Sequence, residues 1–293
     1  MSEIWSKIIA FFMALMGVIG SVPAQTQTQI PENAQTHEIV VMSYNVYIKG
    51  TGRKSPENRS EGVISIIRNE MPDVFGLQEA DEAWMNRIKN GMPEYTAVGR
   101  GRGKTETEGE YSPVFFKTDK YDLVDSGTFW FSDTPEKSSL TWGALFRRIS
   151  TWAVLRDKAT GFEFAVFNSH WDHISVISRN KSAELLVEKA KEYAPGLPVV
   201  IIGDFNCEAD TVAYKNLIDA GFVDSMYVAE ETTDIGTYHG YTKDSTEGVM
   251  PIDHILFLDE YGFAQSYRVI TDKYDGIYPS DHLPIVSNII LYK

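Results

Sequence analysis

Cysteine is almost absent from this sequence. Cys207 is the only one among 293 residues, so no intramolecular disulfide can form and the fold must depend on a sizeable apolar core. A catalytic thiol would need a partnered histidine and an oxyanion site. We therefore interpret Cys207 as a small packed residue and not as a nucleophile.

Positive charge is also scarce. Lys and Arg total 27 against 41 Asp and Glu, which gives a formal net charge of −14. This balance argues against a protein that grips long nucleic acid regardless of its sequence, because such binding needs many basic side chains. It does not exclude chemistry on nucleic acids, since a metal site built from carboxylates is itself acidic. Nothing in the sequence implies a protein partner, and we expect a monomer.

Long apolar runs are limited to the amino terminus. The run from Ile8 to Gly20 is too short to span a bilayer comfortably, it follows Lys7, and small residues follow it at Ser21–Ala24. This pattern predicts a signal peptide over residues 1–24, cleaved after Ala24, and therefore an exported protein that is periplasmic or secreted. An uncleaved membrane anchor is the alternative. Residues 25–37 are rich in Gln and Thr, and we expect a flexible lead-in there.

No internal repeat or linker divides residues 38–293, and 43% apolar with 23% charged residues is an ordinary globular composition. One α/β domain is therefore expected. Short apolar runs rich in β-branched and aromatic residues predict strands at Ile39–Val46, Asp73–Leu77, Val114–Lys117, Phe129–Phe131, Thr151–Leu155, Phe162–Phe167, Pro198–Ile202, His254–Leu258 and Leu283–Ile290. Helical patterns occupy Asn58–Asn69, Asp81–Lys89, Val176–Tyr193 and Thr211–Ala220. Two packed sheets with helices on the outside fit this order better than one doubly wound sheet.

Chemically capable side chains fall at the ends of the predicted strands. Four strands end in such groups and two further groups precede or begin strands, namely Ser43-Tyr44-Asn45, Leu77-Gln78-Glu79, Asn168-Ser169-His170, Gly203-Asp204-Phe205-Asn206, Ile252-Asp253-His254 and Ser280-Asp281-His282. If the last strands run antiparallel to the first four, all six groups meet at one edge of the core. Carboxylates, amides and imidazoles gathered there would lose hydration, and a hard divalent cation would offset that cost.

Each group also has a structural interpretation. Asn45 suits a turn, Glu79 suits a helix cap, Gly203–Asn206 suits a tight turn, and Asp281-His282 suits a surface pair. A further alternative is a zinc site built from His170, Asp172 and His173, although other soft ligands are lacking. The arrangement of all six groups is much harder to obtain by chance than any one of them, so we favour a single hydrolytic site.

The order and spacing of these six groups resemble the endonuclease/exonuclease/phosphatase superfamily, which shares the DNase I-like fold. Gly-Asp-Phe-Asn after an apolar strand and Ser-Asp-His near the carboxyl terminus are the most specific signals. Gly109–Phe115, Trp130 and Arg148–Trp152 further resemble an exported bacterial branch of that superfamily. The resemblance covers about residues 38–293. It implies a four-layer α/β sandwich, two mixed sheets flanked by helices, with the site at one sheet edge.

The resemblance also implies a magnesium site. By position, Glu79 is similar to the principal Mg²⁺ ligand of the family, with Asn45 beside it and Asp281 nearby. Mn²⁺ is an expected substitute. Asp204 is similar to the residue that orients or deprotonates the attacking water. A single strong protein carboxylate leaves room on the cation for substrate oxygen and water.

The remaining roles concern the phosphate. The resemblance implies that Asn206 and His170 hold the non-bridging oxygens, and that His282, oriented by Asp253, stabilises the charge that builds on phosphorus. Tyr111 falls where the family often has a tyrosine that contacts phosphate. The expected activity is therefore hydrolysis of a small-molecule, lipid-linked or nucleic-acid phosphoester by a phosphodiesterase, phosphatase or nuclease.

Two alternatives remain open at this point. One is a non-catalytic module that binds phosphate ligands with the same fold, although such a copy is expected to lose one of its central side chains. The other concerns residues 99–110, whose Gly-Arg repeats and charges indicate either a solvated loop or a lid that contacts phosphate.

Overall fold

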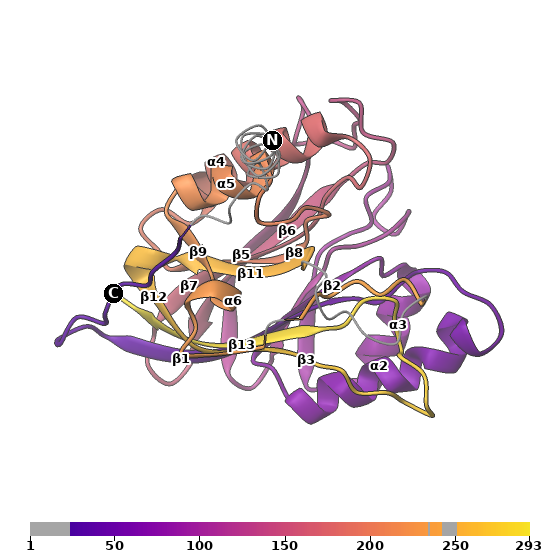
Figure 1. The fold of residues 1–293 in the computed structure, drawn as a ribbon, viewed down its shortest axis with the longest axis horizontal. Helices are drawn as coiled ribbons and strands as arrows, with labels where there is room; N and C mark the ends of the chain where they lie inside the picture. The colour runs from indigo at the N-terminus through magenta and orange to yellow at the C-terminus, as the bar shows by residue number, and fades with distance from the viewer. Residues whose placement is uncertain (1–23, 234, 242–250) are drawn as a thin grey trace, which may run out of the picture.

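The protein has two β-sheets that pack against each other (Figure 1). The computed structural model describes residues 24–233, 235–241 and 251–293, so nearly all of the predicted signal peptide lies outside the described residues. In order, the seven-stranded sheet contains β10 (Glu231–Thr232), β12 (Gly262–Val269), β13 (Ile285–Tyr292), β1 (Thr36–Asn45), β2 (Val74–Gln78), β4 (Val114–Lys117) and β3 (Tyr95–Val98). The six-stranded sheet contains β5 (Tyr121–Trp130), β6 (Ile149–Asp157), β7 (Glu163–His170), β8 (Val199–Asp204), β11 (Asp253–Leu258) and β9 (Phe222–Asp224).

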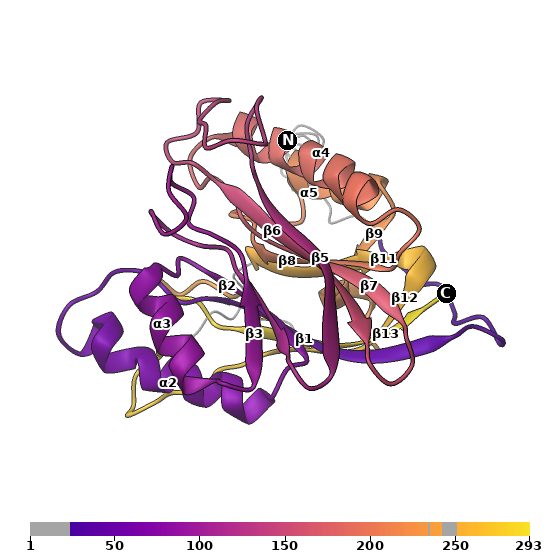
Figure 2. The same cartoon turned by 180° about the vertical axis from the view of Figure 1, so that it is seen from behind.

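Helices cover the outer faces of both sheets. The longer ones are α2 (Pro56–Glu70), α3 (Glu82–Gly91), α4 (Val176–Tyr193) and α5 (Val212–Asp219), and α6 (Ser225–Val228) is a single turn. Figures 1 and 2 show α2 and α3 outside the seven-stranded sheet and α4 and α5 outside the six-stranded one. Three apolar clusters fill the spaces, one between the sheets and one under each pair of helices. The fold is therefore the expected four-layer α/β sandwich.

Strand direction brings the polar groups to one edge. β1 is parallel to β2 and antiparallel to β13, while β7 is parallel to β8 and β8 is antiparallel to β11. The carboxyl ends of β1, β2, β7 and β8 therefore lie at the same edge as the amino ends of β11 and β13. The last strands therefore run antiparallel to the earlier ones, as they must for the six polar groups to meet at one edge.

Buried amides join the two sheets behind that edge. Gln78 in β2 donates a hydrogen bond of 2.7 Å to Asn168 in β7, and Asn168 donates to the carbonyl oxygens of Leu77 and Pro113. Gly76 makes this contact possible, because a Cβ there would lie 2.4 Å from the Asn168 side chain. These bonds fix the spacing of the sheets where the site begins.

Most predicted elements match the structure, and the differences have physical reasons. The predicted strand at Phe129–Phe131 is the end of the longer β5, whose middle is exposed and polar and therefore has no apolar run. The sequence analysis also missed β3, β9, β10 and β12, of which β9 and β10 are only three and two residues long. No helix in the described ranges is long and apolar enough to cross a membrane.

The segment before β1, where we expected a flexible lead-in, contacts the rest of the protein. β1 already begins at Thr36, and earlier side chains bond to the body of the domain. Gln25 donates to the Tyr214 hydroxyl and accepts from the Asp224 backbone, while Gln27 makes two hydrogen bonds to the backbone of Ala264. Glutamine side chains can replace a strand's backbone donors and acceptors, which is why this polar segment lies against the domain.

Candidate active site

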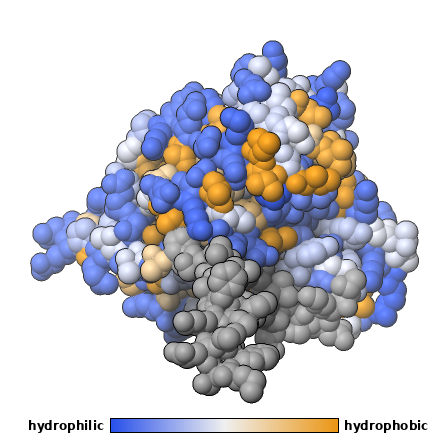
Figure 3. Space-filling model, turned by 45° about the horizontal axis from the view of Figure 1, so that its top comes forward, coloured by the Kyte–Doolittle hydropathy of each residue, from blue (hydrophilic) through white to orange (hydrophobic). Residues whose placement is uncertain are grey.

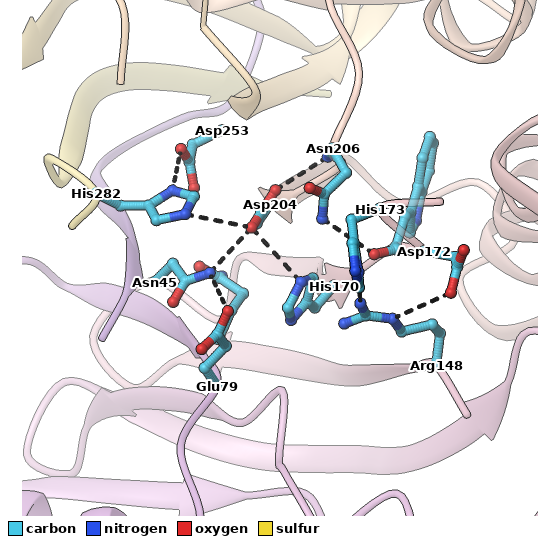
Figure 4. Close-up of polar contacts among 12 residues, drawn as sticks. Asn45, Glu79, Arg148, His170, Asp172, His173, Asp204, Asn206, Asp253 and His282 are labelled. Carbon is cyan, nitrogen blue, oxygen red and sulfur yellow. Dashed lines mark hydrogen bonds and ion pairs between the residues drawn. The ribbon is translucent and has the colours of Figure 1, made fainter. Parts of the chain in front are cut away.

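A cavity of about 490 Å³ opens at the sheet edge where the polar strand ends meet. Its walls include most of the residues singled out in the sequence. They are Glu79, His170, Asp204, Asn206, Asp281 and His282. Asn45 and Asp253 lie directly behind this wall and hydrogen bond to its members (Figure 4).

The proposed metal ligands form one end of the cavity. The Asn45 amide donates to Glu79 Oε1 over 3.3 Å, and the Ile48 backbone donates to Glu79 Oε2 over 3.1 Å. Glu79 has φ of 60°, a left-handed conformation that is uncommon for residues other than glycine and that recurs at functional sites. Burial and the nearby Glu79 charge raise the pKa of Asp281.

This donor set fits a hard divalent cation. Glu79 and Asp281 supply oxygen ligands, and a bound cation would relieve the repulsion that raises the pKa of Asp281. The Asn45 amide oxygen accepts a hydrogen bond from the Tyr47 backbone while its nitrogen faces the carboxylates. In this arrangement Asn45 orients Glu79, and it would need to rotate its amide to act as a ligand.

Asp204 occupies the centre of the site. Its Oδ2 accepts from Asn45 over 2.9 Å and lies 3.5 Å from His170 Nε2, while its Oδ1 accepts from the Asn206 backbone. Burial and the charge of Asp253 raise the pKa of Asp204 to about 7. Gly203 allows β7 and β8 to approach closely here, since a Cβ at its φ of 149° would lie 2.0 Å from a carbonyl oxygen of β7.

His170 and His282 differ in protonation, since the first imidazole is neutral and the second is positively charged. Burial and the Arg148 guanidinium hold the pKa of His170 well below its usual value, so its imidazole is neutral at neutral pH. Burial alone would lower the pKa of His282, but Asp253 and Asp204 raise it to about 10. His282 Nδ1 donates to Asp253 Oδ2 over 2.9 Å, and Nε2 lies 3.8 Å from Asp204 Oδ2. The site therefore contains one carboxylate-paired imidazolium beside a carboxylate (Figure 4).

Two other groups of residues are less suited to a metal ion than Glu79 and Asp281. Ligand atoms of Asp204, Asp253 and His282 lie within 4.8 Å of one another, but a protonated imidazole repels a cation and has no lone pair to offer. The alternative zinc triad does not converge, because Asp172 accepts from the backbone of Ile174 and Ser175 while His173 faces Arg148. We therefore assign the first group to hydrogen bonding and discard the zinc site.

The structure does not bring Tyr111 into the cavity. Its backbone donates to the Ala80 carbonyl, and its ring belongs to the core beneath the seven-stranded sheet. Several further residues line the cavity that the sequence did not assign to the hydrolytic site. They are Tyr47, Lys49, Arg102, Glu110, Phe146, Arg148, Tyr238 and His173, of which His173 was considered only for the alternative zinc site. Of these, Arg102 and Glu110 belong to the charged loop of residues 99–110, so that loop contributes to the wall and is not merely solvated.

The fold and this site together define the class. A two-sheet α/β sandwich with carboxylates, amides and a paired imidazole at one sheet edge has the architecture of the DNase I-like proteins. The chain belongs to the Endonuclease/Exonuclease/phosphatase family, whose pattern matches residues 42–282.

Solved structures from Bacteroides thetaiotaomicron are similar over nearly their whole length. An endonuclease/exonuclease/phosphatase family protein is 31% identical with a TM-score of 0.83, and the match covers 87% of this chain and 98% of the other. A mannosyl-6-phosphatase is 31% identical with a TM-score of 0.81, covering 86% and 99%. An uncharacterised protein of Acanthamoeba polyphaga mimivirus is 27% identical over 78% of this chain and 90% of its own length.

Proposed function

We propose that the protein is an exported, Mg²⁺-dependent phosphoester hydrolase. The observation that carries this proposal is the convergence of Glu79, Asp204 and the Asp253–His282 pair on one cavity of about 490 Å³. Gathering these buried or half-buried acidic groups at one cavity costs hydration and does not by itself stabilise the fold. Attack of water on a phosphate ester does require such groups, since negative charge builds at phosphorus.

Each side chain has a role in this chemistry. Glu79, with Asp281 and Asn45, would hold Mg²⁺, which when bound supplies Lewis acidity at a phosphoryl oxygen. Asp204 orients the attacking water and takes its proton, because its carboxylate faces the cavity centre between His170 and His282. Its Oδ1 is held by the Asn206 backbone, so the carboxylate cannot rotate freely. His282 donates to the phosphoryl oxygen while Asp253 fixes its orientation.

The phosphate oxygens need further donors. The neutral His170 and the side chain of Asn206 face the same cavity and are suited to hold non-bridging oxygens. The Asn206 amide already donates to the Trp171 carbonyl over 3.1 Å, which leaves one N–H for a ligand. Asn206 has φ of 48°, so its position depends on a turn that Asn adopts more readily than most residues.

The substrate is proposed to be a small or lipid-linked phosphoester. The net charge of −14 disfavours long nucleic acid. Apolar and aromatic side chains line part of the cavity, including Phe146, which is 43% exposed, and Tyr238, which is also 43% exposed. On the face that Figure 3 draws, several apolar patches lie among hydrophilic residues. The similarity to a mannosyl-6-phosphatase supports including sugar phosphates among the candidates.

A substrate panel with Mg²⁺ and with EDTA tests this function. It should contain DNA, RNA, sphingomyelin, inositol phosphates, mannose 6-phosphate and a generic aryl phosphodiester. We expect turnover of at least one small or lipid-linked phosphoester with Mg²⁺ and none with EDTA. Binding without turnover across the panel would instead support the non-catalytic module, and EDTA-resistant turnover would contradict the metal assignment.

Export is a separate part of the proposal. It is supported by the amino-terminal apolar run and the small residues before Gln25. Cleavage after Ala24 would keep the Gln25 side chain, which bonds to Tyr214 and to the Asp224 backbone. We expect amino-terminal sequencing of exported protein to begin at Gln25. Material that still begins at Met1 would contradict the cleavage.

A further inference from the structure

Arg148 is a buried cation with unused donors. Its side chain is 4% exposed, it lines the cavity, and neither Nε nor Nη1 has a hydrogen-bond partner within the described part of the chain. Only Nη2 is engaged, with His173 Nδ1 at 3.0 Å. A buried guanidinium whose N–H groups are unmatched is costly, so such a group is retained where a ligand completes it.

The neighbouring carboxylates do not satisfy Arg148. Asp172 Oδ2 lies 3.9 Å from Nε, beyond hydrogen-bond distance, and the Asp172 carboxylate already accepts from the backbone N–H groups of Leu145, Ile174 and Ser175. Glu110 pairs with Arg102 over 2.6 Å. Neither neighbouring carboxylate therefore accepts a hydrogen bond from Arg148, and its Nε–H and Nη1–H groups are left for a ligand.

The histidines beside Arg148 add no positive charge. Burial and Arg148 lower the pKa of both His170 and His173, so neither adds a charge at neutral pH nor competes with Arg148 for an anion. The neutral His173 imidazole contacts Arg148 through Nδ1, and its other ring nitrogen can donate or accept a hydrogen bond. A buried guanidinium beside a neutral imidazole is a favourable receptor for a phosphate or carboxylate.

Arg148 and His282 lie at different ends of the site. Figure 4 shows His282 with Asp253 on one side of Asp204 and His170, and Arg148 on the other. The two cationic groups therefore face different parts of the cavity. The hydrolysed phosphate is assigned to the side of His282, Asp204 and Glu79, so Arg148 is available for another anion.

We propose that Arg148, with Arg102 beside it, binds a second anionic group of the substrate, a phosphate or carboxylate next to the phosphate that is hydrolysed. This proposal rests on the proposed function, because the second anion belongs to a substrate only if the protein hydrolyses phosphoesters. The preferred substrates would then be phosphoesters that carry two anionic groups. The unmatched Nε–H and Nη1–H groups supply donors to the second anion, and the charge of the guanidinium strengthens those hydrogen bonds.

Binding of inorganic phosphate to the purified protein in EDTA tests the subsite without requiring turnover. Calorimetry would compare the wild type with Arg148→Met, Arg148→Lys and His282→Gln. The matched control is Arg156→Met, which removes an arginine at the other end of β6 whose side chain is 49% exposed. We expect Arg148→Met to weaken phosphate binding by about tenfold or more, since charge-assisted hydrogen bonds are lost.

The other variants decide where the phosphate lies. Arg148→Lys keeps the positive charge and loses the guanidinium N–H groups, so it should weaken phosphate binding several-fold. This variant replaces Arg148→Met in the test if the Met variant does not fold. Arg156→Met and His282→Gln should retain the Arg148-dependent affinity. Wild-type affinity in both Arg148 variants would overturn the subsite. Equal losses in His282→Gln and Arg148→Met would place both residues on the same phosphate and overturn the second-anion assignment. A protein that binds phosphate as expected but turns over no ester would refute the proposed function alone.

Discussion

The amide nitrogen of Asn45 donates a hydrogen bond of 2.9 Å to Asp204 Oδ2, and this bond joins the two sheets at the site. Asn45 is the last residue of β1 in one sheet, and Asp204 is the last residue of β8 in the other. The same nitrogen lies 3.3 Å from Glu79 Oε1. One amide thus sets the distance between the carboxylate proposed to hold the cation and the carboxylate proposed to orient water.

Glu79→Ala should abolish most activity and leave the fold intact. The change removes the strongest proposed Mg²⁺ ligand, and we expect turnover to fall by about 10²-fold or more. Folding should survive because the substitution also removes a charge that opposes ionisation of Asp281. Calorimetric Mg²⁺ titration measures the loss of metal binding, and thermal unfolding shows whether the fold survives. Glu82→Ala, at an exposed position in the first turn of α3, is the matched control. Full turnover by Glu79→Ala at limiting metal would show that the metal lies elsewhere.

Arg59 ties together the two loops that carry the site. Its guanidinium donates to the carbonyl oxygens of Val46, Tyr47, Lys49, Lys54 and Pro279, and the residue is 1% exposed. The first four carbonyls belong to the loop after β1, and the last precedes Ser280-Asp281-His282. Arg59 therefore acts as a positioning residue.

Arg59→Met should be strongly destabilising. It leaves several buried carbonyl groups without donors, and we expect a loss on the order of 3 kcal/mol or more in the free energy of unfolding. Urea unfolding measures this. Arg68→Met in the same helix, with a side chain that is 52% exposed, should change stability by less than about 1 kcal/mol. Similar losses in the free energy of unfolding for the two variants would refute the positioning role of Arg59.

The sequence predicted the elements that bury apolar runs, because burial on both faces leaves consecutive apolar residues. β8 and α4 are examples, and α4 begins and ends where the sequence indicated. β5 could not be predicted in full, since its middle residues are exposed at the sheet edge. The burial of Arg59 could have been predicted, because its position lies on the same face of α2 as the buried Val63 and Ile66.

The site was predicted only where it lies at strand ends. The six polar groups could be aligned from their order and from an assumed strand direction, which the sheet topology bears out. Arg148 directly precedes β6, which is antiparallel to β7, so strand direction places it at the same edge. The sequence analysis singled out Arg148–Trp152 by resemblance, but the predicted strand there began only at Thr151, and Arg148 was not assigned to the site. The resemblance suggested Tyr111 for the site, yet its bridge to Ala80 directs this residue into the core.

His254 should make stability depend on pH. It lies on the opposite side of β11 from Asp253, buried, with Nδ1 2.8 Å from Asp224 and Nε2 2.9 Å from the Cys207 carbonyl. Burial alone would lower its pKa, but the bond and charge of Asp224 raise the pKa above 6.5. A folded-state pKa above the unfolded value stabilises the protein fully below about pH 6.5, and this contribution is lost as the pH rises through the folded pKa.

Thermal or urea unfolding between about pH 5 and 9 checks this prediction. The stability difference between wild type and His254→Gln should be largest below about pH 6.5 and should shrink at higher pH. His239→Gln is a useful contrast, because burial lowers the pKa of His239 to about 4 and the opposite trend is expected below neutral pH. A constant difference between wild type and His254→Gln across the range would contradict the raised pKa.

The central claim is that Asp253 and His282 act as one unit on the phosphoryl group. His282 donates to Asp253 over 2.9 Å, and Thr237 donates to the same carboxylate oxygen over 2.6 Å, so the pair is held rigidly. His282→Gln keeps some hydrogen bonding and loses the positive charge. Turnover should then fall by about 10²–10³-fold while Mg²⁺ affinity changes little. Asp253→Asn should cause a similar loss, since the imidazole loses its charged partner.

Steady-state kinetics of His282→Gln, Asp253→Asn and the double variant, on the best substrate from the panel, test this claim most directly. If the two residues act together, the double variant should be little worse than either single one. Near-normal turnover in His282→Gln, or losses that multiply fully in the double variant, would contradict the pairing on which the proposed chemistry rests.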